Sequence, residues 1–346
     1  MWKLKDKMRA VVLTAPESLE LKEVPVPEPQ FGQALVKVKS TAVCRSDVSG
    51  YLGHHPMIDP PRIMGHECSG VLEKLGPGVE HWSIGDEVIV ETFFYSCGRC
   101  PGCRSGRYNV CNDVKVIGHN VDGSFAEYAL VNASFIYGKP EEVSFDEAAL
   151  TEPLSVGVHA VRRCGIGVGD FVVILGAGAI GLMVLQVAKA SGAEVLIADL
   201  VDSKLELARK LGADHIVNAS RQDTVEAVSE ATDGEMAPYV LEAVGRPETI
   251  RQMVDLACSG GTLMPIGFTG NDLDEINLSR ITLSEMDLLG ILGFCRDFPT
   301  SINLMKRNLV DMKSLISGHY SLDEVEDAIK FSIENPDQVV RSIVNP

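Results

Sequence analysis

The sequence is short of positive charge. Its 346 residues include 31 lysines and arginines against 48 aspartates and glutamates, which gives a formal net charge of −17 at pH 7. A surface this acidic repels the phosphate backbone of nucleic acids and anionic lipid headgroups. We therefore expect neither a nucleic acid nor a membrane as a partner.

Long hydrophobic runs are also missing. The most apolar stretch, residues 171–185, is shorter than the about 20 residues that a membrane helix needs, and three glycines interrupt it. The charged N-terminus MWKLKDKMRA lacks the long apolar core of a signal peptide. There is no low-complexity segment and no internal repeat. We expect a cytoplasmic globular protein, and the length suggests two domains at about 100–200 residues each.

The cysteines gather in one place. Of the nine in the chain, four lie in the run CGRCPGCRSGRYNVC, at Cys97, Cys100, Cys103 and Cys111. Thiolates at this spacing suit a tetrahedral Zn²⁺ with no open position, which is a structural metal site. The other interpretation is two disulfides or idle thiols, but disulfides need an oxidising compartment that nothing in the chain indicates.

The pattern of the sequence changes near residue 155. Before it, short apolar runs alternate with Gly/Pro turns, which is typical of a strand-rich domain. After it, strand-like and helix-like runs alternate, as in a doubly wound parallel sheet. We expect strands near 172–175, 195–199, 215–217, 239–243, 262–266 and 288–292. From about Gly293 the pattern is mixed again. The predicted domains are 1–157, 158–292 and a return to the first domain over 293–346.

A glycine motif follows the first of these later strands. Residues 171–175 (FVVIL) lead into Gly176, Gly178 and Gly181 at the spacing GxGxxG, and Ala179 and Ile180 lie in the helix that begins there. This strand–turn–helix context is the one that binds dinucleotides. Gly176 allows the tight turn, Gly178 allows the pyrophosphate to approach the backbone, and Gly181 packs helix against strand.

An acidic residue follows at the expected distance. Asp199 ends the next strand, 23 residues after Gly176, where a carboxylate can accept the hydroxyls of the adenosine ribose. It would repel the 2′-phosphate of NADP. The sequence therefore predicts NAD as the cofactor.

Three separated segments carry residues that can bind zinc. They are CRSD at 44–47, GHE at 65–67 and TEPLS at 151–155. One cysteine, one histidine and one or two carboxylates form a zinc site that leaves a position open. Taken singly, each residue has a plainer interpretation: a core thiol, a satisfied histidine or a surface acid. Sequence pattern alone does not bring them together.

In this order, CRSD, GHExxG, the four cysteines, EPLSVGVHA and GAGAIG resemble the zinc-dependent medium-chain dehydrogenase/reductases, over nearly the whole chain. Residues 152–181 look most like the sorbitol (polyol) dehydrogenase branch. The cysteine segment and its flanks look also like threonine 3-dehydrogenase and 2,3-butanediol dehydrogenase. The resemblance implies a Rossmann domain with a GroES-like barrel domain, and a structural zinc lobe at about 93–113. It also implies a homotetramer or homodimer that interconverts a secondary alcohol and its ketone.

The resemblance also implies roles for single residues. Cys44, His66 and either Glu67 or Glu152 would hold a catalytic zinc, the second of two zincs per chain. Ser46 would pass the alcohol proton outward, and Asp47 would orient the His66 imidazole. Three basic residues would bind the cofactor, Arg45 and Arg341 at the pyrophosphate and Lys204 at the adenosine ribose.

Departures from the relatives concern the substrate pocket. Ser49 stands where relatives often carry a proton-relay histidine, so His54, His55 or water would take that part. Threonine dehydrogenases have a histidine where Phe93 stands and an arginine at Phe294, and sorbitol dehydrogenases carry Arg-Tyr at 293–294. Phe93 and Phe294, with Tyr51, therefore predict a less polar pocket.

Three alternatives stay open. One is oxidation of an amino alcohol, as in L-threonine 3-dehydrogenases. The second is a zinc-free quinone or enone reductase of the same fold, against which the set of Cys44, His66 and Glu67 argues. The third is a non-catalytic structural or regulatory protein that binds NAD and zinc.

Overall fold

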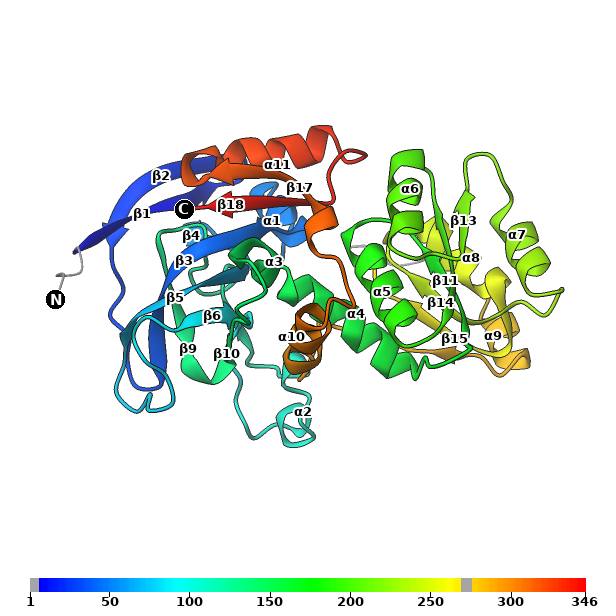
Figure 1. The fold of residues 1–346 in the computed structure, drawn as a ribbon, viewed down its shortest axis with the longest axis horizontal. Helices are drawn as coiled ribbons and strands as arrows, with labels where there is room; N and C mark the ends of the chain where they lie inside the picture. The colour runs from blue at the N-terminus through cyan, green and yellow to red at the C-terminus, as the bar shows by residue number, and fades with distance from the viewer. Residues whose placement is uncertain (1–5, 269–275) are drawn as a thin grey trace. The chain divides into compact units, whose positions relative to one another are not determined.

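The computed structural model describes residues 6–268 and 276–346 and divides the chain into two compact units (Figure 1). The first unit comprises Met1–Glu152 and Met312–Pro346, and the second comprises Pro153–Asp311. No helix among the described residues is long and apolar enough to cross a membrane.

The first unit is built mostly of antiparallel strands. One sheet has the order β2-β1-β4, and a larger one has the order β10-β6-β5-β3-β18-β17, with β9 pairing β3. The strands of these two sheets are β1 (Lys7–Ala15), β2 (Ser18–Pro25), β3 (Gln33–Val43), β4 (Arg62–Ile63), β5 (Glu67–Leu75), β6 (Glu87–Val90), β9 (Tyr128–Asn132), β10 (Ile136–Gly138), β17 (Ile316–Ser321) and β18 (Arg341–Asn345). The helices are α1 (Arg45–Tyr51), α2 (Pro101–Arg104), α3 (Phe145–Ala149) and α11 (Val325–Glu334). This is the strand-rich architecture that the Gly/Pro-punctuated half of the sequence predicts.

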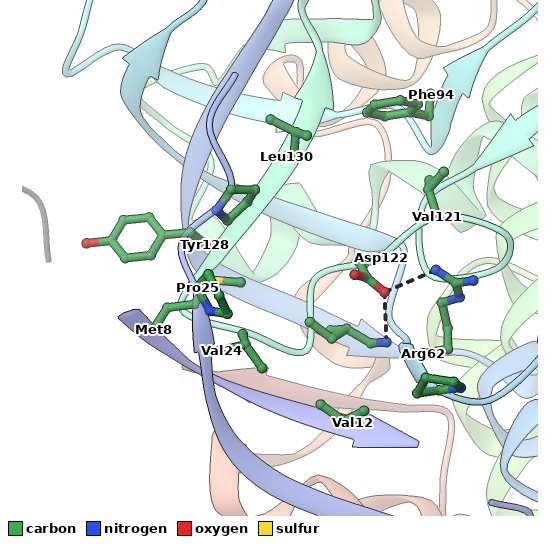
Figure 2. A pocket seen from close by; sticks show the side chains of 14 residues that line it. Met8, Val12, Val24, Pro25, Arg62, Phe94, Val121, Asp122, Tyr128 and Leu130 are labelled. Atoms are coloured by element: carbon green, nitrogen blue, oxygen red, sulfur yellow. Dashed lines mark hydrogen bonds and ion pairs between the residues drawn. The ribbon is translucent and has the colours of Figure 1, made fainter. Parts of the chain in front are cut away.

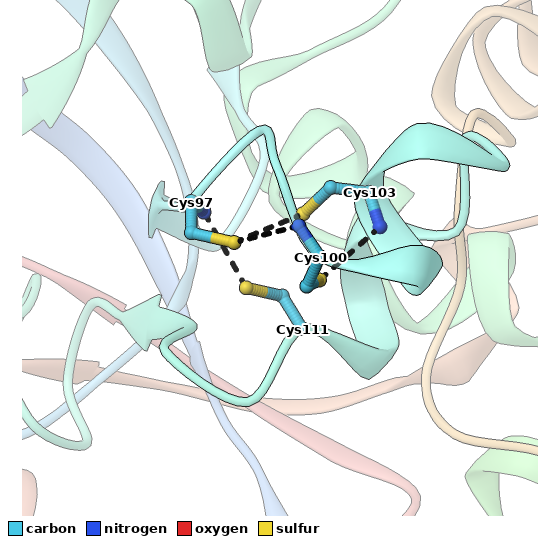
Figure 3. A group of neighbouring side chains, drawn as sticks. All are labelled: Cys97, Cys100, Cys103 and Cys111. Atoms are coloured by element: carbon cyan, nitrogen blue, oxygen red, sulfur yellow. Dashed lines mark hydrogen bonds between the residues drawn. The ribbon is translucent and has the colours of Figure 1, made fainter.

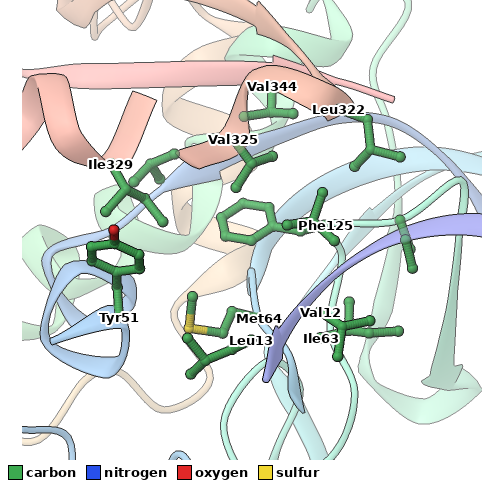
Figure 4. Close-up of a cluster of buried hydrophobic side chains, with 14 of the residues drawn as sticks. Val12, Leu13, Tyr51, Ile63, Met64, Phe125, Leu322, Val325, Ile329 and Val344 are labelled. Carbon is green, nitrogen blue, oxygen red and sulfur yellow. The ribbon is translucent and has the colours of Figure 1, made fainter. Parts of the chain in front are cut away.

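The C-terminal segment completes the core of this unit. Strand β18 pairs antiparallel with β3, and α11 packs beside α1 and β18 (Figure 1). Val325 and Ile329 of α11 join Leu13, Met64 and Phe125 in one buried apolar cluster (Figure 4). Because α11 closes this cluster, residues near 330 belong to the same core as residues near 10.

The second unit is a six-stranded parallel sheet with helices. Its strand order is β13-β12-β11-β14-β15-β16, and every neighbouring pair is parallel. This is the order of a doubly wound dinucleotide-binding sheet. The strands are β11 (Phe171–Leu175), β12 (Glu194–Asp199), β13 (His215–Asn218), β14 (Ala237–Glu242), β15 (Ala257–Pro265) and β16 (Asp287–Leu288). The helices are α4 (Thr151–Cys164, which starts in the first unit), α5 (Ala179–Ala190), α6 (Asp202–Lys210), α7 (Thr224–Ala231), α8 (Pro247–Leu256), α9 (Leu278–Leu283) and α10 (Phe298–Lys306). The α/β fold class predicted from sequence is thus confirmed.

The last predicted strand is much shorter than 288–292. It pairs with β15 only at Asp287 and Leu288, and the N–H of Leu289 donates to the carbonyl of Leu263. The next bond of a parallel ladder would need an N–H at Pro265, which proline lacks. The ladder therefore ends there.

The chain returns to the first unit at Met312, later than the predicted residue 293. Helix α10 stays in the second unit because Asp297 at its start is tied to α4. The fully buried Asp297 carboxylate pairs with His159 and Arg162, and Ser301 Oγ lies 2.8 Å from Ser155 Oγ. The composition near 293 does not show these long-range contacts.

Candidate active site and metal centres

Strand register brings Cys44, Glu67 and Arg341 together. In the first unit β3 lies between β5 and β18, with Ala42 opposite both Glu67 and Ile343. In antiparallel pairs, opposed residues share a face and the side-chain period is two. Cys44, two residues beyond Ala42, therefore falls on the face of Glu67, and Arg341, two residues before Ile343, falls there too.

Three potential ligands converge at this point. The Sγ of Cys44, a ring nitrogen of His66 and a carboxylate oxygen of Glu67 all lie within 4.8 Å of one another. His66 and Glu67 are buried. Arg341 Nη2 lies 3.0 Å from Glu67 Oε1, yet without hydrogen-bond geometry, so both buried oxygens of Glu67 lack a hydrogen bond within the described part of the chain. Buried acceptors of this kind fit a cation.

Asp47 fixes the position of this centre. Asp47 is the third residue of α1. Its Oδ2 accepts a hydrogen bond from the N–H of Cys44 at 2.8 Å, which is the contact that the third helical residue makes with the N-cap backbone in a capping box. Its Oδ1 accepts from the N–H of Gly65 at 3.1 Å and lies 3.6 Å from His66 Nδ1. The fully buried Asp47 thus joins the Cys44 segment to the His66 segment, and it leaves Nε2 of His66 for a ligand.

The charges of the centre call for a cation. Burial raises the pKa of Glu152 to about 8, and the neighbouring Glu67 adds to this shift. Burial alone would raise the pKa of Asp47, but His66 and the Cys44 N–H reverse this and lower it. The acidic groups Asp47, Glu67 and Glu152 face one permanently charged base, Arg341, within this group. A Zn²⁺ ion would balance the carboxylates and a Cys44 thiolate, so the donor set fits the metal.

The four clustered cysteines form a second centre (Figure 3). Their sulfurs lie within 4.8 Å of one another, with Cys97 Sγ 4.0 Å from Cys103 Sγ, and none forms a disulfide. A tetrahedral site with Zn–S bonds of about 2.3 Å holds its sulfurs about 3.8 Å apart. The antiparallel strands β7 (Phe93–Tyr95) and β8 (Lys115–Val116) close the loop that carries them.

Backbone N–H groups of this loop already support thiolates. The N–H groups of Cys100 and Cys103 donate to the sulfurs of Cys97 and Cys100, and that of Cys97 donates to the sulfur of Cys111. Hydrogen bonds from the backbone of Arg99 and Cys100 lower the pKa of Cys97 to about 6. Metal-binding sulfurs accept such bonds as thiolates. The donor set fits a structural zinc with no open position.

The glycine motif of the second unit has the expected geometry. Gly176 has a φ of +100°, which favours glycine, and a Cβ on Gly181 would lie 1.8 Å from the carbonyl oxygen of Gly176. A Cβ on Gly178 would meet nothing within 4 Å, so the space beside it is open. Ala179 and Ile180 begin α5, whose first N–H groups can bind a phosphate.

Asp199 is held at the carboxyl end of β12. Its Oδ1 accepts from the N–H groups of Leu200 and Val201, and its Oδ2 accepts from the N–H of Ala177 at 2.7 Å. A carboxylate offers about four acceptor positions. One acceptor position on Oδ2 is therefore left for a ribose hydroxyl. The sequence had suggested that Asp199 could accept both ribose hydroxyls.

The basic residues expected at the cofactor have different surroundings. Arg45 is exposed on α1, and Lys204 is half-buried in the first turn of α6. Arg341 is buried against Glu67. Their contacts with a pyrophosphate or ribose stay predictions.

Tyr51 is not a pocket residue. It lies in the apolar cluster of the first unit (Figure 4). Its hydroxyl donates to Glu326 Oε1 at 2.9 Å. The helical spacing of α1 turns Tyr51 toward α11, a contact that the sequence did not reveal. Phe93 packs on Tyr108 and Phe135 in the first unit, and Phe294 packs on Phe298 in the second. Their part in a pocket stays a prediction.

The sequence analysis missed His119. Its ring lies 4.8 Å from that of His66 and 4.6 Å from that of His55, measured between centroids. His119 follows Gly118 as His66 follows Gly65, and the two glycines are in contact: a Cβ on Gly118 would lie 2.4 Å from the oxygen of Gly65. Gly-His pairs also occur at 53–54 and 318–319, so the sequence carried no signal that singles out His119. His55 is half-buried, whereas His54 is exposed.

A groove of 420 Å³ lies elsewhere in the first unit (Figure 2). Its wall is mainly apolar and includes Val12, Val24 and Leu130. Its charged groups, Arg62 and Asp122, pair with each other at 3.1 Å. None of the metal-centre residues lines it, so it offers no catalytic chemistry.

Comparison with known proteins supports the dehydrogenase interpretation. Residues 30–141 match the profile of the alcohol dehydrogenase GroES-like domain, and residues 179–307 match that of the zinc-binding dehydrogenases. Sorbitol dehydrogenase of Bacillus subtilis is 33% identical over 99% of this chain and 98% of its own length. L-threonine 3-dehydrogenase of Pyrococcus horikoshii is 36% identical over 94% of this chain and 96% of its own.

A solved structure agrees with both relatives. A short chain alcohol dehydrogenase of Escherichia coli CFT073, complexed with the cofactor NADH, superposes with a TM-score of 0.93 at 30% identity. The alignment covers 99% of this chain and 100% of that one. On the two matching profiles, the full-length relatives and the shared fold, this chain belongs to the zinc-dependent alcohol dehydrogenases of the medium-chain dehydrogenase/reductase family.

Proposed function

We propose that this enzyme oxidises a secondary alcohol of the diol or polyol class to the ketone, with NAD⁺ as the hydride acceptor. The observation that carries the proposal is the set of the half-buried Cys44 and the buried His66 and Glu67, whose ligand atoms converge without a fourth protein ligand among the described residues. A zinc site with three protein ligands keeps a position open for substrate. Sorbitol dehydrogenases among the relatives support the substrate class.

The residues of the centre have separate tasks in this proposal. Bound zinc would supply a Lewis acid that lowers the pKa of the alcohol, and bound nicotinamide would accept the hydride. Ser46 Oγ lies 3.4 Å from His66 Nε2. Its hydroxyl accepts the alcohol proton and passes its own proton outward to solvent through a hydrogen-bonded relay. Asp47, with Oδ1 3.6 Å from Nδ1 of His66, orients the imidazole. Glu67 is the third ligand, and Arg341 offsets its charge; Glu152 exchanges with Glu67.

We propose a second zinc at Cys97, Cys100, Cys103 and Cys111. This site has no open position, so it stabilises the loop between β7 and β8 and takes no part in turnover. Metal analysis tests both sites at once. We expect two zincs per chain in the wild type and one in a Cys44→Ser variant. One zinc in the wild type would contradict the assignment.

We propose NAD over NADP because Asp199 would meet a 2′-phosphate with like charge, and neither Leu200 nor Val201 offers that phosphate a cation. Arg221, which follows β13, has its Nη2 2.6 Å from Asp202 Oδ2. Asp202 in turn accepts from Asn218 Nδ2, whose amide also reaches the Leu200 carbonyl. The charge of Arg221 is therefore neutralised. Repulsion between Asp199 and a 2′-phosphate is on the order of 1–3 kcal/mol, or about ten- to a hundredfold in affinity.

Cofactor choice is tested by kcat/KM with each cofactor. Asp199→Ala should lose most of the preference, mainly through weaker use of NAD⁺. Asp202→Ala should raise the use of NADP⁺ by releasing Arg221, and Arg221→Ala in the same protein should cancel the gain. A wild type that uses NADP⁺ as well as NAD⁺ would overturn the proposal.

A panel of alcohols tests the substrate class. It includes 2-butanol, 2,3-butanediol, sorbitol, a cyclic alcohol and L-threonine, each followed by NADH absorbance. We expect the highest kcat/KM with a diol or polyol. The highest value with L-threonine would favour the amino-alcohol alternative, which a relative at 36% identity supports. No turnover of any alcohol by the zinc-loaded protein would favour a non-catalytic role.

We also propose that copies of this chain associate, as a homotetramer or a homodimer. Among the described residues, no strand pairs with the outer side of β16, which is an edge of the parallel sheet. The nearby Leu283 is 85% exposed, and Leu288 of β16 is 45% exposed. Exposed apolar side chains at a sheet edge favour pairing with a second chain. Light scattering after size-exclusion chromatography measures the mass, and a monomer would contradict the proposal.

A further inference from the structure

His119 is a buried polar side chain without a partner. Only 9% of its surface is exposed, and neither ring nitrogen has a hydrogen bond among the described residues. An imidazole carries at least one N–H donor in either protonation state. Leaving such a donor unsatisfied costs about 1–3 kcal/mol, so a buried group in this condition needs an explanation.

The position of His119 is fixed by the backbone rather than by its ring nitrogens. Gly118, with a φ of +74°, packs against Gly65, and the N–H of Ser124 donates to the carbonyl of Gly65 at 2.9 Å. The N–H of His119 donates to the carbonyl of Val116 at 3.3 Å. The loop is thus anchored to the segment that carries His66. The ring is held in place while its nitrogens stay available.

Two simpler roles for His119 are a hydrogen bond to Nδ1 of His55 and the binding of a metal ion, and its surroundings exclude both. The ring of His55 also contacts that of His119, but Nδ1 of His55 accepts a hydrogen bond from the N–H of Met57 at 3.3 Å. His119 is not a metal ligand, because the ligand atoms that cluster in the described chain are those of Cys44, His66 and Glu67 and of the four cysteines. What remains is a buried polar group whose ring contacts that of His66, a proposed metal ligand, and whose nitrogens have no hydrogen bond among the described residues.

We infer that His119 binds a second hydroxyl of the substrate while the reacting hydroxyl occupies the zinc site. This inference rests on the proposed function and narrows it, because it makes His119 a residue that selects polyhydric over monohydric secondary alcohols. A site that provides a partner for a hydroxyl discriminates against an analogue without it, because the protein group is then left unpaired. The second hydroxyl lies on a carbon close to the reacting one, since the rings of His66 and His119 are in contact.

The test compares 2,3-butanediol with 2-butanol, which share a carbon skeleton and differ by one hydroxyl. His119→Phe keeps an aromatic ring and removes both nitrogens, and His119→Asn restores a donor and an acceptor. We expect His119→Phe to lower the ratio of the two kcat/KM values, diol over monohydric alcohol, about five- to fiftyfold. His119→Asn should recover part of it. The matched control, His55→Phe, alters the other histidine whose ring contacts His119 and should change the ratio less than twofold.

A binding measurement provides a readout other than activity. Calorimetric titration of each alcohol into the zinc-loaded enzyme saturated with NADH, which prevents oxidation, should show tighter binding of 2,3-butanediol in the wild type. That advantage should be lost in His119→Phe. If His119→Phe weakened the binding of both alcohols equally, the role of His119 would be purely structural, and the inference would be overturned. If His119→Phe changed neither the ratio of kcat/KM values nor the ratio of affinities, water would be the hydrogen-bond partner of the ring. That result would also overturn the inference.

The outcomes separate this inference from the proposed function. If the zinc-loaded wild type neither binds nor oxidises either alcohol, the proposed substrate class is wrong and the inference is wrong with it. If the wild type oxidises both alcohols and the ratio in His119→Phe is unchanged, only the role of His119 is wrong. Zinc analysis of each variant shows whether the catalytic centre is intact.

Discussion

Removal of the Arg341 charge should destabilise the protein far more when the catalytic zinc is absent. The Arg341 side chain is 6% exposed and that of Glu67 is 0% exposed, with 3.0 Å between Nη2 and Oε1. Removing one partner of a buried ion pair costs about 3–5 kcal/mol, because the other charge stays buried and uncompensated. In Arg341→Leu that remaining charge is the Glu67 carboxylate, beside Asp47 and Glu152.

Zinc changes the expected size of this loss. With a divalent cation at the centre, the negative charge of Glu67 stays compensated after the arginine is gone. Without it, the full loss should appear. At about 2–4 °C per kcal/mol for a unit of this size, the melting temperature should fall by about 6–20 °C in protein stripped of the catalytic zinc. The fall should be clearly smaller in loaded protein.

Scanning calorimetry of wild type and Arg341→Leu, each with two zincs and with one zinc per chain, measures the four melting temperatures. Arg341→Lys keeps the charge and should recover much of the loss. Arg221→Leu is the matched control, since it breaks a surface pair with 67% and 57% exposed side chains, worth at most about 1 kcal/mol. Equal falls with and without the catalytic zinc would refute the reasoning, and so would a fall no larger than that of the control.

Other substitutions address single parts of the molecule. Cys100→Ser should reduce the zinc content from two to one per chain and lower the melting temperature by several degrees. The reason is that a closed thiolate site couples metal binding to folding. An unchanged melting temperature would show that the loop needs no metal. Cys44→Ser should abolish turnover but leave the dissociation constant for NADH, measured by fluorescence, within about threefold; retained turnover at one zinc per chain would exclude the catalytic centre. Gly178→Ala should weaken NADH binding without changing the melting temperature, because the added Cβ meets no protein atom within 4 Å. Gly181→Ala should lower the melting temperature, because its Cβ would lie 1.8 Å from a backbone oxygen. Equal effects of the two substitutions would contradict the distinct roles of the glycines.

Features confined to a short stretch of chain could be predicted from the sequence. The four cysteines lie within 15 consecutive residues, so the loop has few ways to fold without bringing their sulfurs together. The glycine motif is likewise local: a tight turn needs a positive φ at Gly176 wherever it occurs. The parallel strands before and after it follow from continuous apolar runs, which suit a sheet covered on both faces.

Features that depend on pairing between distant segments could not be predicted. Cys44 and Arg341 are almost 300 residues apart, and only the register of β3 with β18 places them on one face. The ion pair of Arg341 with Glu67, the burial of Tyr51 under α11 and the position of His119 beside His66 all depend on such contacts. A family resemblance indicated which residues would form a metal centre, but it did not indicate these neighbours.

The sequence by itself therefore determined the local geometry of the cysteine loop and the nucleotide turn, because covalent spacing and backbone sterics act over a few residues. The tertiary structure alone decided which charges, rings and unpaired nitrogens surround the catalytic centre. Strand register and helix docking are set by the burial of whole apolar faces, and a single residue reveals its partner only after those faces have packed.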